Sequence, residues 1–142
     1  MSYEIEAKLI ETRFNEQWGS TTPIKWDNVD YQPSAETTYV DFQIHNNSSN
    51  VVGISGNNNM HRVRGLIAIN IYVALNAGTR SGRELADQAA AIFREVEISN
   101  SDSSEAESMT ISCDAANITR LGKIEDWFVY NVTVPFYRNE IF

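Results

Sequence analysis

The sequence has 142 residues, a formal net charge of −8 and one cysteine. This length suits a single domain with a sizeable hydrophobic core, and the acidic balance excludes a general nucleic-acid binder, which needs a basic face for phosphates. One cysteine excludes an intrachain disulfide, completes no zinc-ligand pattern and suits a reducing compartment. The first residues mix acidic and apolar side chains, unlike a signal peptide, and no run approaches the ~18 apolar residues of a membrane span.

The first half of the chain predicts one helix and two strands joined by a long hairpin. Apolar residues recur at helical spacing over residues 3–18, and residues 37–44 alternate as in a strand. Residues 45–61 are rich in Asn, Ser and Gly, which favour loops. Residues 62–75 alternate with apolar side chains on both faces, which predicts a central strand covered on both sides.

The second half predicts another helix and two more strands. Residues 81–96 have an apolar stripe at helical spacing, and the polar residues 97–108 predict an acidic loop. Residues 109–121 and 127–137 alternate again. The order of elements predicts an α+β fold in one domain, residues 1–142, with a mostly antiparallel sheet of about four to five strands flanked by two helices.

The turn before the second helix invites comparison with a phosphate-binding loop. A Walker loop requires G-x-x-x-x-G-K-[ST], but Gly78 and Gly82 are one residue too close and Arg83 stands in place of the lysine. A turn followed by a helix N-terminus explains the same residues, with Ser81 as the N-cap and Glu84 at the capping-box position. An anion at this helix start, held by Arg80 and Arg83, remains an alternative and would make the chain a small anion-binding domain.

Other reactive residue types form no catalytic pattern. His45 and His61 flank the predicted hairpin loop with only Asp41 near them, whereas zinc sites use three or four protein ligands, so two surface histidines are expected. Cys113 lies in an alternating segment without a basic neighbour in sequence, which predicts a buried, inert thiol. The acids between residues 95 and 114 lack the spacing of a calcium-binding loop.

The hairpin gives the one indication of assembly that follows from the residues themselves. An isolated two-stranded arm is marginally stable, so it gains stability by packing on another subunit. Arg62 and Arg64 lead into the central strand and are candidates to pair with acids in the same chain or in a neighbour. No enzyme is predicted.

Three segments together resemble a known family. They are "IKWDNVDYQPSAETTYVDFQI" at 24–44, "RGLIAINIYVALNAGTRSGRELADQAAAIF" at 64–93 and "WFVYNVTVPFYRNEIF" at 127–142. Their order after an N-terminal helix is similar to that of the tail terminator (tail completion) proteins of long-tailed bacteriophages. The matching residues are Trp26, Asn28, Tyr31, Pro33, Tyr39, Val40, Gly65, Gly78, Gly82, Leu85, Ala86, Asp87 and Phe93. Tyr31 departs from the phenylalanine expected at its position.

The resemblance implies a structural virion protein that forms a ring, expected to be a hexamer, on the end of the tail tube. Such a ring ends tube polymerisation and offers a docking face for the head, without a cofactor, a metal or a membrane. Implied partners are further copies of the chain, the tail tube protein and a head-completion or connector protein, while DNA passes through the lumen without specific binding. The implied location is the head-proximal end of the virion tail, after assembly in the host cytoplasm. A head–tail connector is the alternative within the same structural class.

Two surfaces are expected to serve this assembly. The hairpin is expected to reach a neighbouring subunit or the tube through His45, Asn50, Val51, Val52, Ile54, Asn58, Met60, His61, Arg62 and Arg64. The acidic loop is expected at an exposed end or in the lumen, where it would repel DNA. Its acids are Glu95, Glu97, Asp102, Glu105 and Glu107.

Overall fold

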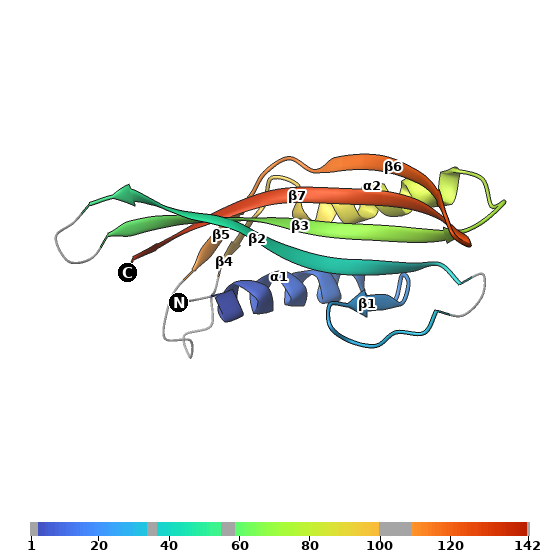
Figure 1. Cartoon of the computed structure of the whole chain (residues 1–142), viewed down its shortest axis with the longest axis horizontal. Helices are drawn as coiled ribbons and strands as arrows, with labels where there is room; N and C mark the ends of the chain where they lie inside the picture. The colour runs from blue at the N-terminus through green and yellow to red at the C-terminus, as the bar shows by residue number, and fades with distance from the viewer. Residues whose placement is uncertain (1–2, 34–36, 55–58, 100–108, 142) are drawn as a thin grey trace.

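The structure is a computed structural model that describes residues 3–33, 37–54, 59–99 and 109–141. Its elements are α1 (Tyr3–Trp18), β1 (Ile24–Trp26), β2 (Tyr39–Gly53), β3 (Met60–Ala74), α2 (Arg80–Phe93), β4 (Glu97–Ser99), β5 (Thr110–Cys113), β6 (Asn117–Ile124) and β7 (Trp127–Ile141). Figure 1 shows an elongated molecule in which β2, β3 and β7, each of 15 residues, follow the long axis.

The strands form one mixed sheet with β3 near its centre. The order is β1-β2-β3-β7-β5-β4, and β6 pairs with β7 beside β5. Only β1 runs parallel to its neighbour, β2, and the other pairs are antiparallel. The predicted α+β fold is confirmed. Its seven described strands exceed the predicted four to five because β1 and β4 have three residues each, too few for an alternating pattern to be recognised.

Both helices pack on one face of this sheet. Phe14 of α1 stacks on Phe42 of β2 at 4.5 Å between ring centroids, and it lies 6.2 Å from the ring of Phe93 of α2. Ile69 of β3 and Val132 of β7, which are paired in register, are fully buried in the same cluster. The helices also touch directly, since Arg13 Nε donates to the carbonyl of Ile92 over 2.8 Å. The opposite face of the sheet carries no helix in the described part of the chain (Figure 1). The prediction that the strand over residues 62–75 is covered on both sides is therefore not met by any helix among the described residues.

The second helix begins and ends earlier than predicted. Thr79, not Ser81, is the N-cap residue, and it makes no side-chain capping bond. The predicted capping box is wrong because Glu84 Oε1 instead accepts a bond from Arg80 Nε at 3.1 Å. The helix ends at Phe93, since Glu95 takes a positive φ of 54° and its N–H donates to the carbonyl of Asp114.

The strand predicted over residues 109–121 is also divided. Its first part is β5, which pairs with β7 near Phe136, and its last part belongs to β6, which pairs with β7 from Thr133 back to Trp127. Two short strands therefore share one side of β7. The 127–137 prediction was too short at its C-terminal end, because β7 continues to Ile141 beside β3.

Candidate assembly surface

The predicted hairpin exists, but most of its predicted loop is strand. β2 continues to Gly53, and β3 begins at Met60. The expectation of a two-stranded arm was wrong, because β7 runs beside β3 up to the pairing of Ile141 with Met60. We call residues 46–53, 60–65 and 136–141 the arm; it forms the narrow end of the molecule in Figure 1. Three hydrogen-bonded strands make it a firmer projection than a hairpin alone.

The arm carries exposed apolar side chains that are not part of the hydrophobic core. Val51 is 52% exposed, Val52 49%, and Ile54, just beyond the end of β2, 86%. No charged residue occurs between positions 46 and 60 of the sequence. Exposed apolar side chains gathered on a projecting element are typical of a surface that another protein covers.

The other predicted arm residues lie along the same strands. Asn50 and Arg62 are paired on one face of the arm. The next residues along the strands, Val51 and His61, are paired on the other face beside Glu140. The two histidines do not face each other, because His45 pairs with Leu66. Asn58 lies outside the described residues. The remaining predicted contact, Met60, is 39% exposed.

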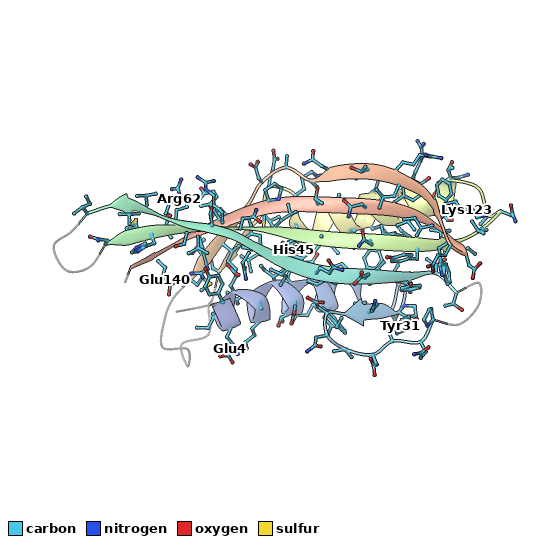
Figure 2. The ribbon with its side chains drawn as sticks, viewed as in Figure 1. Glu4, Tyr31, His45, Arg62, Lys123 and Glu140 are labelled. Carbon is cyan, nitrogen blue, oxygen red and sulfur yellow. The ribbon has the colours of Figure 1, made fainter. Side chains whose placement is uncertain are left out.

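Arg62 and Arg64 lie on the helix-free face of the arm. Arg62 Nε donates to Asn139 Oδ1 over 3.1 Å, and its guanidinium lies 4.6 Å from the centroid of the Tyr137 ring. Arg64 is exposed and has no ion-pair partner among residues 3–33, 37–54, 59–99 and 109–141. Figure 2 shows Arg62 near the narrow end of the molecule and Tyr31 toward the other.

The predicted acidic loop is described only in part. Glu95 is exposed after α2, and Glu97 begins β4, so this end of the segment belongs to the sheet. Asp102, Glu105 and Glu107 lie outside the described residues.

The start of α2 is shaped by packing. Gly82 is buried inside the helix, and a Cβ there would lie 2.4 Å from the Tyr130 ring, so close helix–sheet contact accounts for this glycine. Gly78 has a φ of +77°, the conformation that a turn requires of glycine. Arg80 is paired with Glu84 on the surface, while Arg83 is exposed.

Sequence reasoning missed two clusters. On the helix-free face, Tyr39 stacks on Tyr72 at 4.7 Å and meets the Trp127 ring edge-on at 5.2 Å. In the interior, Glu6 of α1 pairs with Arg138 of β7. The one sequence signal for this pair is the position of Arg138, which continues the inward-facing series of apolar residues in β7.

Cys113 is buried, and its surroundings disfavour the reactive thiolate form. Burial raises the pKa of the Cys113 thiol to about 11, against a smaller opposing effect of Arg13, so the prediction of a buried, inert cysteine agrees with its surroundings. Within the described ranges, no three His, Cys, Asp or Glu side chains are grouped to hold a metal ion. No helix in those ranges is long and apolar enough to cross a membrane.

The fold and this surface define a small α+β protein with a projecting arm suited to assembly. A family model described as phage tail terminator protein matches residues 5–136. The chain therefore belongs to the phage tail terminator family and is a structural protein of the phage tail, as the resemblance predicted.

Structural comparison agrees on the fold. One solved structure that is 14% identical superposes with a TM-score of 0.66, covering 92% of this chain and 94% of the other. At that identity the likeness shows the fold alone. No curated protein matches the chain in sequence.

Proposed function

We propose that the protein forms a ring, expected to be a hexamer, that caps the tail tube, ends its polymerisation and provides the face on which the head docks. Family membership supports the role at the tail end. The observation that carries ring formation is the arm, where Val51, Val52 and Ile54 are exposed in the described part of the chain. A projection that packs on a different surface of the next copy generates a closed ring when the rotation between copies is suitable.

We further propose that the acidic segment after α2 lines the lumen of the ring. Glu95 and Glu97 are exposed beside β5, and further acids follow in the sequence. An acidic wall repels DNA, so a lumen lined by this segment would let DNA pass without binding. The partners of the ring would be the tail tube protein on one face and a head-completion or connector protein on the other.

Native mass measurement with and without the tail tube protein, followed by negative-stain imaging, tests the proposal. The expected result is a ring of about six copies or a cap at one end of the tube. Val51→Asp with Val52→Asp should abolish this assembly, because carboxylates would have to be buried in the contact. Leu121→Asp is the matched control, since Leu121 is 46% exposed on β6, away from the arm. Binding along the tube wall, or unaffected assembly of the double variant, would overturn the proposal.

A further inference from the structure

An acidic groove lies between α1 and the turn that follows β1. It has a cavity of about 460 Å³ lined by Glu11, Thr12, Asn15, Trp26, Asp27 and Val29. Val29 is 57% exposed, and the left-handed φ of Asn28 turns the chain beside it. Lys8 and Lys25 are near in sequence, but neither lines the groove. The groove thus combines two carboxylates with an aromatic and an aliphatic surface.

The two carboxylates are close enough for Asp27 to disfavour the charge of Glu11. Burial and, after it, the neighbouring Asp27 raise the pKa of Glu11. A cation placed between them would relieve that repulsion. A metal ion is not the expected occupant, because no group of three or more metal-ligating side chains occurs in the described ranges.

An arginine side chain suits such a groove. Its guanidinium donates to two carboxylates at once, and its aliphatic stem and flat face pack on aromatic and apolar surface. Arg64 offers this group, since it is exposed on the arm and has no ion-pair partner among the described residues. The uncharged stretch of residues 46–60 beside it brings no acid that would oppose docking on an acidic surface.

The groove and the arm of one chain cannot meet. Trp26 at the groove pairs with Phe42 of β2, whereas Arg64 lies opposite Ser48, six positions further along that strand. Six residues of strand span about 20 Å, more than an arginine side chain can bridge. Within one chain Arg64 therefore does not enter the groove, and the arm and the groove are two different surfaces, as a head-to-tail contact requires.

We propose that the arm of one copy docks on the α1–β1 groove of the next copy, with Arg64 between Glu11 and Asp27. This inference rests on the proposed ring and names its subunit contact. All three side chains are exposed on the isolated chain, so substitutions there are expected to leave the fold intact.

A charge exchange tests the contact. Arg64→Glu and Asp27→Arg should each weaken self-association at least tenfold in sedimentation velocity, and the double variant should recover at least half of the assembled fraction. Arg83→Glu is the control, because Arg83 is exposed on α2 and does not line the groove. Far-UV circular dichroism checks that each variant is folded.

The outcomes separate this inference from the ring itself. If the native protein assembles and both single variants assemble equally well, the docking pair is wrong and the ring stands. Two defective single variants without recovery in the double variant would also overturn the pair. If the native protein forms no ring and no tube cap under any condition, the proposed function fails, and the docking proposal fails with it.

Discussion

Arg138 Nε donates to Glu6 Oε1 over 2.8 Å in the protein interior, which joins the last strand to the first helix. The two side chains are 0% and 1% exposed. Arg138 Nη1 also donates to Glu140, and the guanidinium lies 5.1 Å from the centroid of the Tyr3 ring. This network anchors the N-terminal turns of α1 to β7 at the point where β7 enters the arm.

Removing the cation of this network should destabilise the protein strongly. Arg138→Leu leaves the buried Glu6 carboxylate without the guanidinium that neutralises it, and breaking a buried pair costs about 3–5 kcal/mol. Urea unfolding followed by tryptophan fluorescence measures the loss. Arg83→Leu, an exposed arginine on α2, should change the free energy of unfolding by less than about 0.5 kcal/mol. A loss below about 1 kcal/mol for Arg138→Leu would contradict an anchoring role.

A helix and a strand with a clear local periodicity were predicted correctly from the sequence. The helix over residues 3–18 appears as α1 with the same bounds, and the strand that is apolar on both faces is β3, near the centre of the sheet. Register between distant strands leaves no such local signal. Nothing in residues 127–142 shows that β7 extends beside the hairpin, and so the arm was expected to have two strands.

Burial of charged residues was missed for a related reason. Glu6 looks like a first-turn acid that favours the helix dipole from the solvent side. Its burial depends on Arg138, which is 132 positions away in the sequence. The groove at Glu11 and Asp27 likewise forms only when β1 pairs with β2. β1 has three residues, too few for a periodic pattern to be detected in the sequence.

Gly82→Ala should destabilise the protein although alanine favours helices. In an open helix this change would stabilise by about 1 kcal/mol. Here the new Cβ would lie 2.4 Å from the Tyr130 ring, and Tyr130 is buried, so we expect a net loss of about 1–3 kcal/mol. Thermal unfolding measures the change. The double variant Gly82→Ala with Tyr130→Val should lose less than the two single changes together, and strict additivity would argue against this contact.

Cys113 should react slowly with thiol reagents in the folded protein. With its pKa raised to about 11, the thiolate fraction at pH 8 falls to about one in a thousand, roughly a hundred-fold or more below that of a free cysteine. The rate of reaction with Ellman's reagent measures this, and the same sample in concentrated urea is the control. A native rate equal to the denatured rate would show that the thiol is accessible and unshifted.

Tyr39 should make stability fall at high pH. Burial, with further effects of Tyr72 and Asp41, raises the pKa of Tyr39 from 10.0 to about 12. Between these values the unfolded chain loses the phenolic proton and the folded chain keeps it, so the free energy of unfolding decreases as the pH rises. Below pH 10 both states hold the proton, so the full contribution of Tyr39 to the free energy of unfolding is present.

Tyr39→Phe isolates this effect because it keeps the ring and removes the proton. The Tyr39 ring stacks on Tyr72 and meets Trp127, and phenylalanine preserves both contacts. Urea unfolding at pH 9, 10 and 11 should show a shallower decline for the variant, by at most about 1.4 kcal/mol per pH unit. A residual decline is expected, since burial raises the pKa of Tyr72 as well. Identical slopes for the two proteins would mean that the Tyr39 hydroxyl ionises equally easily in the folded and unfolded states, and that the aromatic cluster is open to water.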